Sequence, residues 1–207
     1  MDKILITGGT GRLAAELKKH LAGEYVGIEH WDFTYPIPVG KYDIILHMGA
    51  WTDVAKGEQE PYKVFQTNTY GTFNMILNYK DTPFAYISTE WAKDPISIYA
   101  LTKYLGEEIV KYHPHHLIMR TLFKPNPFPF PKAYKDQYTQ GDYVDVIAKL
   151  VADKINSWDR KTNELCYIGT GRKTIFDLAK KTRPNVEPNS VDEWRAKIGN
   201  IIPYDYE

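Results

Sequence analysis

Short apolar runs alternate with longer stretches of helical periodicity through the first 120 residues of the chain. The runs lack the polar alternation of a half-exposed sheet, which is typical of strands buried on both faces. Between the first two runs, Leu13, Leu17 and Leu21 share one face of a helix. Strands that alternate with helices in this way predict a parallel α/β sheet. We expect strands at 3–7, 25–29, 43–47, 84–88 and 116–120, and helices at 12–21, 61–79 and 98–112.

The pattern changes after residue 120. Prolines at every second position make 124–132 an extended segment, because proline does not fit a helix interior. Beyond this segment we expect helices at 144–155, 174–181 and 191–198 and a short strand at 165–168. A length of 207 residues allows one sizeable domain with a small appendage, and not two full domains.

Composition and charge narrow the function classes. Lys plus Arg and Asp plus Glu number 26 each, so no net charge attracts nucleic acid or an anionic membrane, and we expect neither as a partner. No stretch reaches the roughly 18 consecutive apolar residues of a membrane span. The single Cys166 excludes an internal disulfide and fits a reducing compartment. The chain enters a strand at once, so we expect no signal peptide and a cytoplasmic location.

A glycine-rich segment, TGGTGRLA, joins the first strand to the first helix at residues 7–14. In such a turn, glycines let the backbone approach a pyrophosphate, and the helix start supplies free N–H groups. The spacing Gly8-x-x-Gly11-x-x-Ala14 is looser than the strict dinucleotide fingerprint, so an ordinary tight turn remains an alternative. Glu29 follows the second strand, where an acid can bind a ribose 2′-hydroxyl, whereas Arg12 could meet a 2′-phosphate. The choice between NAD and NADP therefore stays open.

A second candidate site lies in the helix predicted at 98–112. Tyr99 and Lys103 are four residues apart and therefore share one helical face. A lysine ammonium near a phenol lowers its pKa, which suits proton exchange with a carbonyl or an alcohol. Ser88-Thr89 ends a predicted strand, and ligands of open parallel sheets bind at the carboxyl ends of strands. A hydroxyl there can hydrogen-bond the same substrate oxygen.

These motifs, in this order, resemble the extended short-chain dehydrogenase/reductase family, and within it the dTDP-4-dehydrorhamnose reductases. Ala85-Tyr-Ile-Ser-Thr-Glu90 is similar to the family's Tyr-Ile-Ser-Thr-Asp strand, and Tyr99-Ala-Leu-Thr-Lys-Tyr-Leu-Gly-Glu107 to its Tyr-Gly-x-Ser-Lys-x-x-Gly-Glu helix. Further matching segments are His47-Met-Gly-Ala-Trp-Thr-Asp-Val54, Glu60-Pro61, Asn68-Thr-Tyr-Gly71-Thr-x-Asn74 and Gly141-Asp-Tyr-Val-Asp-Val146.

The resemblance implies a Rossmann-type doubly wound sheet that binds NAD or NADP, in one domain over 1–207 with substrate-side elements mainly in 121–207. It implies that Tyr99 donates a proton, that Lys103 orients the nicotinamide ribose and tunes Tyr99, and that Thr89 holds the substrate oxygen. The implied cofactor-binding residues are Gly8, Gly11, Arg12, Leu13, Glu29, Asp32, Gly49, Ala50, Trp51, Asn68, Tyr99, Lys103 and Arg120. The implied reaction is reduction of a nucleotide-linked 4-keto-6-deoxy sugar at C4.

The chain departs from the family pattern on the substrate side. Only nine residues separate Thr89 from Tyr99, and the second crossover is reduced to a loop at 36–38. Glu90 stands where the family has Asp. The shorter segments leave fewer residues to recognise a sugar. The sequence therefore predicts the hydride-transfer reaction more firmly than the identity of the substrate. Alternatives are an epimerase or dehydratase of the same family, or a non-catalytic NAD(P)-binding regulatory subunit.

Two further features also allow an ordinary structural interpretation. The resemblance implies that the helices at 61–79 and 98–112 could form a homodimer interface, although their apolar faces could equally be core. The cluster His113-Pro-His-His116 resembles a metal-binding tract, but it lies in a predicted turn, and we expect no metal site.

Overall fold

The computed structural model describes residues 2–29, 32–35, 40–199 and 201–202. Its centre is a six-stranded sheet in which all neighbouring strands are parallel. From β1 the chain adds β2 on one side and then β3, β4, β5 and β10 on the other, which is a doubly wound topology. The predicted Rossmann-type fold is confirmed. The strands in spatial order are β10 (Glu164–Ile168), β5 (His116–Thr121), β4 (Phe84–Thr89), β3 (Ile44–His47), β1 (Ile4–Thr7) and β2 (Glu24–Val26).

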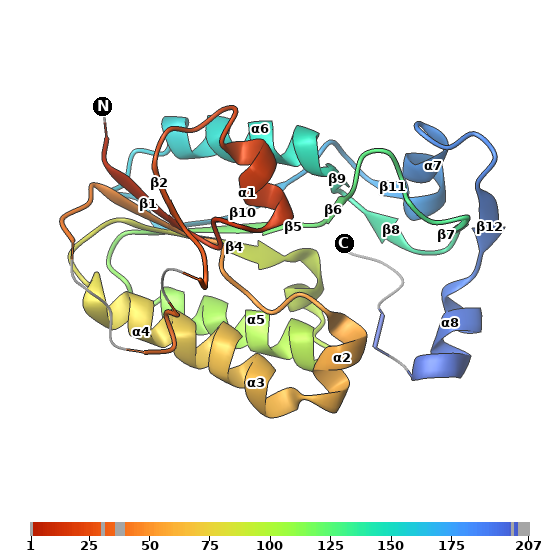
Figure 1. The fold of residues 1–207 in the computed structure, drawn as a ribbon, viewed down its shortest axis with the longest axis horizontal. Coiled ribbons are helices and arrows are strands. Elements are labelled where there is room, and N and C mark those ends of the chain that lie inside the picture. Colours follow the sequence, from red (N-terminus) through yellow and green to blue (C-terminus); the bar gives the residue numbers. More distant parts are fainter. Residues whose placement is uncertain (1, 30–31, 36–39, 200, 203–207) are drawn as a thin grey trace.

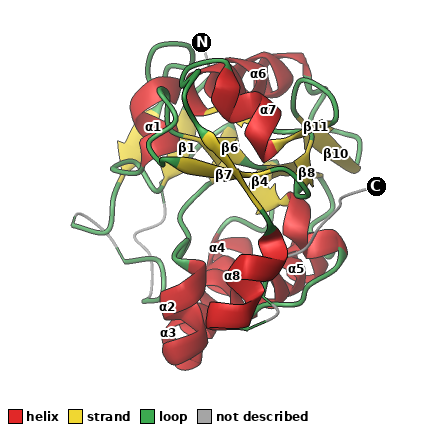
Figure 2. Ribbon diagram, turned by 90° about the vertical axis from the view of Figure 1, so that its right-hand side faces the viewer, coloured by secondary structure: helices red, strands yellow, loops and turns green. Residues whose placement is uncertain are grey.

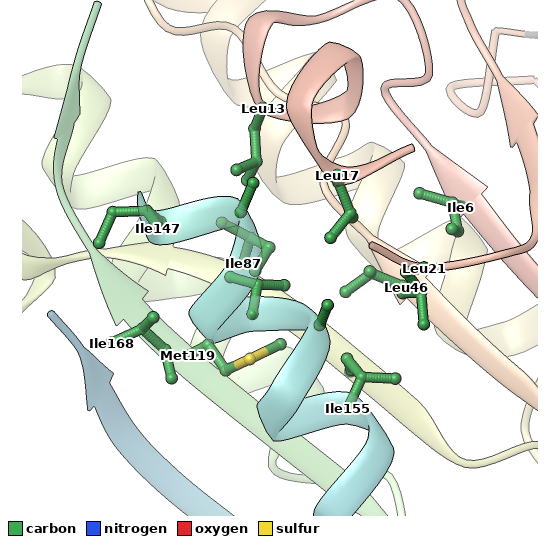
Figure 3. Close-up of a cluster of buried hydrophobic side chains, with 14 of the residues drawn as sticks. Ile6, Leu13, Leu17, Leu21, Leu46, Ile87, Met119, Ile147, Ile155 and Ile168 are labelled. Carbon is green, nitrogen blue, oxygen red and sulfur yellow. The ribbon is translucent and has the colours of Figure 1, made fainter. Parts of the chain in front are cut away.

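Helices cover both faces of this sheet (Figure 1). Helices α1 (Arg12–Leu17) and α6 (Val144–Ser157) lie on one face, where Leu13 and Leu17 pack toward Ile147 and Ile155. Figure 3 shows these side chains meeting over the sheet residues of β1, β3, β4 and β5. The leucine stripe predicted for the first helix therefore forms part of the larger core.

The opposite face carries a long helical run and α5 (Ile98–Val110). The run consists of α3 (Pro61–Phe65), η1 (Gln66–Tyr70), which is π-helical, and α4 (Gly71–Asn78). It occupies the range predicted as one helix, but the sequence did not predict its π-helical turn. The short α2 (Val54–Gln59), capped by Asp53, was also not predicted.

The second strand is shorter than expected. β2 ends at Val26, so Glu29 lies in a turn beyond it. β2 is an edge strand that pairs only with β1, which gives it less support than the central strands have. The described residues between β2 and β3 form turns, and the predicted loop at 36–38 lies outside the described part of the chain.

Small paired strands and two helices gather beside the sheet, at the right of Figure 1 and facing the viewer in Figure 2. They contain a separate small core that includes Phe128, Tyr143 and Leu178. The last helix, α8, begins where Asp136 accepts hydrogen bonds from Ser190 Oγ and Val191 N. The elements are β6 (Phe123–Lys124) with β9 (Asp142–Tyr143), β7 (Lys132–Tyr134) with β12 (Glu187–Asn189), β8 (Tyr138–Thr139) with β11 (Lys173–Thr174), α7 (Ile175–Lys180) and α8 (Val191–Ile198).

Within the described residues, none of the helices combines the length and apolar character needed to cross a bilayer.

Candidate active site

A cleft of about 920 Å³ lies at the carboxyl ends of the parallel strands. It runs from the glycine-rich turn after β1, past the turns after β2 and β3, to the ends of β4 and β5. The sheet order changes direction between β1 and β3, which is where open α/β sheets bind ligands. Its volume lies within the range of small-molecule and cofactor sites.

The glycine-rich turn forms one end of the cleft. Gly8 has a φ of +72°, and a Cβ at this position would lie 2.9 Å from the Gly49 backbone nitrogen. A side chain is therefore excluded by both backbone conformation and space. Gly11 precedes α1, and a Cβ there would meet only the Gly8 carbonyl oxygen, so this backbone is bare toward the cleft. This bare backbone at a helix start fits a pyrophosphate group.

Arg12 and Leu13 follow directly and also line the cleft. The Arg12 side chain is exposed, whereas Leu13 is buried in the core beneath. Lys18 holds the turn from behind, because its Nζ donates to the Gly9 carbonyl oxygen at 3.1 Å.

Buried polar groups hold the turn after β3, where Gly49 and Ala50 line the cleft. Thr7 Oγ1 accepts the Met48 and Gly49 N–H groups, both at 3.1 Å, so its own hydrogen goes to His47 Nδ1 at 2.7 Å. His47 Nε2–H then donates to Thr72 Oγ1 at 3.2 Å. Burial lowers the pKa of His47 to about 3, so the imidazole is neutral and keeps this tautomer.

Asn68 and Trp51 lie behind the cleft wall. Asn68, in the π-helical turn, accepts the Trp51 N–H at 2.7 Å and donates to the Trp51 carbonyl oxygen at 3.2 Å and to Thr102 Oγ1 at 3.0 Å. The Trp51 indole N–H is bound to the Asp53 carbonyl oxygen at 2.9 Å. Both residues thus fix the backbone from behind, and the cleft wall is formed by Ala50, Thr52 and Asp53.

Glu29 and Asp32 occupy the turn region after β2. The exposed Glu29 carboxylate lies against Gly27, which lines the cleft, and Thr10 Oγ1 approaches it at 3.5 Å. Asp32 instead accepts hydrogen bonds from the backbone and hydroxyl of Thr34 at 2.9 and 2.7 Å. Asp32 is therefore bound within its own turn, whereas Glu29 faces the rim of the cleft.

Thr89 and Tyr99 meet at the other end of the cleft. Thr89 is the last residue of β4, and Tyr99 lies in the first turn of α5. The start of α5 is fixed by Ser97 Oγ and by Glu58, which accept the N–H groups of Ala100 and Ile98. Burial raises the pKa of Tyr99 to about 12, opposed by a hydrogen bond with Thr89, so the phenol is protonated at neutral pH.

Lys103 lines the same end of the cleft but binds β4 rather than the phenol. Its Nζ donates to the Ile87 carbonyl oxygen at 2.7 Å and lies 4.0 Å from the centre of the Tyr86 ring. Burial lowers the pKa of Lys103 to about 7, and the Glu107 carboxylate opposes this change. The expected lowering of the Tyr99 pKa by Lys103 is therefore not found: burial dominates, and it raises that pKa.

The Arg120 side chain, expected to bind the cofactor, points away from the cleft and is bound to other groups. Arg120 Nε and Nη2 bind the two Glu107 carboxylate oxygens at 2.9 and 2.6 Å, and Nη1 binds the Tyr167 hydroxyl at 3.2 Å. On β5, Ile118 and Arg120 point toward the α4–α5 side because alternate strand residues share a face. Thr121, Leu122 and Phe123, which follow Arg120, line the cleft instead.

The structure adds cleft residues that the sequence did not indicate. Phe33 lines the cleft with its ring edge-on to His47, at a centroid distance of 4.9 Å. Lys124 also lines the cleft, where burial lowers its pKa and the charge of Glu90 opposes the change. Glu90 itself is fully buried and accepts hydrogen bonds from Thr139 Oγ1 at 2.6 Å and Gln140 N at 3.0 Å. A single half-buried lysine or phenylalanine has no sequence pattern that distinguishes it from an ordinary surface or core residue.

The histidine cluster at residues 113–116 is bound to backbone groups. His113 accepts the His115 N–H through Nδ1 and donates through Nε2 to the Tyr79 carbonyl oxygen at 3.1 Å. Among the described residues, no group of three or more His, Cys, Asp or Glu side chains is arranged to hold a metal ion.

The doubly wound sheet and a glycine-bordered cleft across its switch point define the chain as a Rossmann-type protein with the geometry of a dinucleotide site. The sequence pattern of one family, described as the RmlD substrate binding domain, matches residues 1–193. The chain belongs to this family, so the resemblance seen in the motifs is confirmed.

Known proteins agree with this assignment. A dTDP-4-dehydrorhamnose reductase from Sinorhizobium fredii (strain NBRC 101917 / NGR234) is 27% identical over 146 residues, which cover 58% of this chain and 49% of that relative. The chain thus spans about half the length of the curated relative that it matches.

Solved structures share the fold at lower identity. The dTDP-4-dehydrorhamnose reductase of Bacillus anthracis str. Ames, in complex with NADP, has a TM-score of 0.78 and 23% identity, covering 91% of this chain and 84% of its own. A hypothetical dTDP-4-dehydrorhamnose reductase from Sulfolobus tokodaii has a TM-score of 0.79 and 23% identity, covering 99% of this chain and 90% of its own.

Proposed function

We propose that this protein is an NAD(P)H-dependent reductase of a nucleotide-linked 4-keto-6-deoxy sugar. The observation that carries the proposal is the pairing of a protonated Tyr99 with Thr89 at the far end of a cleft that begins at Gly8. The names of the relatives from Sinorhizobium, Bacillus and Sulfolobus support the same reaction and substrate class.

The cofactor would lie along the cleft from the glycine-rich turn to Lys103. The backbone at Gly8 and Gly11 fits its pyrophosphate, and Gly49 and Ala50 form the wall beside it. Reduced nicotinamide supplies a hydride when bound. Arg12 and Glu29 stand on either side of the turn near the adenosine end, where Arg12 would favour a 2′-phosphate and Glu29 a 2′-hydroxyl.

The chain's own residues would then handle the proton. As the C4 carbonyl is reduced, its oxygen gains negative charge, and Tyr99 delivers the phenolic hydrogen to that oxygen. Thr89 donates a hydrogen bond to the same atom and stabilises the developing charge. Because the pKa of Tyr99 is raised to about 12, its phenol is protonated and able to donate at neutral pH.

Tyr99→Phe tests this assignment. The substitution removes one oxygen and leaves the ring, so NAD(P)H should still bind and shift its fluorescence. Turnover of a dTDP- or UDP-linked 4-keto sugar, followed by NAD(P)H absorbance, should fall by roughly 100-fold or more. Unchanged turnover would refute the role of Tyr99. Product formation without net NAD(P)H consumption would indicate an epimerase or dehydratase, and binding without turnover on any sugar would indicate a regulatory subunit.

We also propose that two copies associate through α3, η1, α4 and α5. One side of these helices is core, but the other exposes Tyr62, Tyr70, Phe73 and Leu77 at 77%, 51%, 42% and 57%. A hollow of about 490 Å³ lies between them. Contiguous exposed aromatic surface of this kind is typical of a protein interface. Sedimentation should show a dimer that Phe73→Glu converts to a monomer; a wild-type monomer at micromolar concentration would refute the interface.

A further inference from the structure

A fully buried ionic cluster lies behind the catalytic end of the cleft. Glu107 of α5 is 0% exposed, and both its carboxylate oxygens bind the Arg120 guanidinium. One of these oxygens also accepts the Ser88 hydroxyl hydrogen at 2.5 Å. Arg120 is 9% exposed and reaches Tyr167 of β10 on its other side. Removing charged groups from water costs free energy even when they are paired, so we expect this buried cluster to have a function.

The cluster ties the strand that carries Thr89 to the helix that carries Tyr99. Ser88 is the residue before Thr89, and its hydroxyl donates to Glu107 of α5. Ile87, one residue earlier, accepts a hydrogen bond from Lys103 of the same helix at 2.7 Å. Glu107 and Lys103 are one helical turn apart on α5, so they bind consecutive residues at the end of β4. This double attachment fixes the position of Thr89 relative to α5.

Glu107 is also the anion whose charge opposes the effect of burial on Lys103. Lys103 is 2% exposed, and its loss of hydration disfavours the charged form. The Glu107 carboxylate acts in the opposite direction and favours the ammonium. The titratable and charged groups around Lys103 are Tyr99 and Glu107 of α5, Tyr86 of β4, neutral His47 of β3, and Arg120 of β5 with its partner Tyr167 of β10.

We propose that Glu107, held by Arg120, is a positioning residue that keeps Lys103 charged and fixes the end of β4 against α5. The inference rests on the proposed reductase function for its consequence in catalysis, but the charge state of Lys103 is a property of the free protein. A charged Lys103 is needed to bind ribose hydroxyls and to favour the Tyr99 phenolate that forms when the proton has left.

The charge state can be measured without cofactor or substrate. Lysines labelled with carbon-13 at Cε report their own titration by NMR, and Lys103→Arg identifies the Lys103 signal. Wild-type Lys103 should titrate near neutral pH, well below the exposed lysines. In Glu107→Gln the pKa of Lys103 should fall by about 1 to 3 pH units, because the opposite charge that favours the ammonium has been removed. Glutamine fits the site, since its oxygen accepts from Arg120 and its amide can donate to Ser88.

Two matched variants separate charge from packing. Glu107→Asp keeps the carboxylate and should largely restore the Lys103 titration, whereas Tyr167→Phe removes a hydroxyl from the cluster without changing charge and should leave it unaltered. If Glu107→Gln does not fold, the double variant Glu107→Gln/Arg120→Gln leaves neither charge of this ion pair buried and unpaired, and the Lys103 pKa should again fall because the charge that favours the ammonium is gone. An unchanged Lys103 titration in folded Glu107→Gln, or in the double variant if only that one folds, overturns the proposal.

Kinetics supply the second readout. Activity that needs the charged Lys103 is lost as the pH rises through the Lys103 pKa. Glu107→Gln should therefore move the alkaline limb of the kcat/KM profile to lower pH by as much as it lowers the Lys103 pKa in the NMR titration. A simple structural defect would lower the whole profile without moving this limb. If the wild-type protein reduces no sugar, the proposed function fails, and the NMR titration still decides the role of Glu107.

Discussion

A helix position next to Lys103 gives the sharpest test of the packing at this site. Gly106 lies on α5 about one turn after Lys103, and a Cβ there would lie 3.0 Å from Tyr86 Cζ and closer still to the Tyr86 hydroxyl. Tyr86 is 0% exposed on a central strand, with its ring stacked on His47 at a centroid distance of 5.8 Å. The ring also carries the Lys103 ammonium over one face, so it has no free direction in which to move.

Gly106→Ala should therefore destabilise the protein although alanine is the better helix former. Overpacking a close-packed core costs about 1–3 kcal/mol. Replacing glycine by alanine inside a helix returns about 1 kcal/mol. Because both the helix backbone and the Tyr86 ring are fixed, we expect a net loss of about 1–2 kcal/mol in the free energy of unfolding.

Tyr86→Phe supplies the matched background, because it removes the hydroxyl, which is the atom closest to the new methyl group. The buried Tyr86 hydroxyl has no hydrogen-bond partner of acceptable geometry among the described residues, so this substitution alone should cost little. In the Tyr86→Phe background Gly106→Ala should cost clearly less, because only the looser contacts with the ring and with the Asn68 carbonyl oxygen remain. The double-mutant cycle should then give an interaction energy of about 1 kcal/mol. Urea unfolding followed by tryptophan fluorescence measures all four proteins. Additive effects of the two substitutions would refute the steric argument.

Three further predictions use the same measurements or simple kinetics. His47 binds a proton in the unfolded chain below about pH 6.5, but in the folded protein only near pH 3. The free energy of unfolding should therefore fall by up to about 1.4 kcal/mol per pH unit as the pH drops from about 6.5 to 3. His47→Gln should make the free energy of unfolding less dependent on pH over this range. Lys124→Met should raise the KM for an anionic nucleotide sugar by roughly tenfold with little change in kcat, whereas Lys149→Met on the surface should change neither. Leu17→Ala should cost about 2–5 kcal/mol of stability, against about 1 kcal/mol or less for Leu165→Ala, which is partly exposed on the edge strand β10 and lies outside the proposed dimer interface.

The central strands were predictable because they are buried on both faces. Ile44–His47 and Phe84–Thr89 are mostly apolar without polar alternation, a pattern typical of central parallel strands. The short α2 has no apolar stripe and was missed; it is a helix because Asp53 caps it. The π-helical turn at Gln66–Tyr70 adds one residue to a turn, which leaves the apolar pattern of a normal helix nearly unchanged.

The residues of the candidate site also divide into those that local sequence could place and those that it could not. Gly8, Thr89, Tyr99 and Lys103 lie at strand ends or on one helix face, so local spacing brought them to one cleft correctly. The direction of Arg120 could not be predicted, because a strand that is apolar on both faces does not show which face each side chain takes. Its partner Glu107 is 13 residues away on another element, and only the packed structure brings the two together.

The substrate end depends on contacts between still more distant parts of the chain. Trp91, two residues after Thr89, packs with Ala100, Val191, Ile201 and Ile202 in one buried cluster that also contacts Tyr99. The segment between Thr89 and Tyr99 is short, and its outer support comes from α8 and from residues 201–202. Arg195 fixes this support by donating through Nε to the Ile202 carbonyl oxygen at 2.9 Å. Local sequence therefore indicated the residues Thr89, Tyr99 and Lys103 of the cleft, whereas the support of the segment between Thr89 and Tyr99 comes from residues about 100 positions away. If the proposed function holds, variation in these distant residues can change the substrate without altering Tyr99.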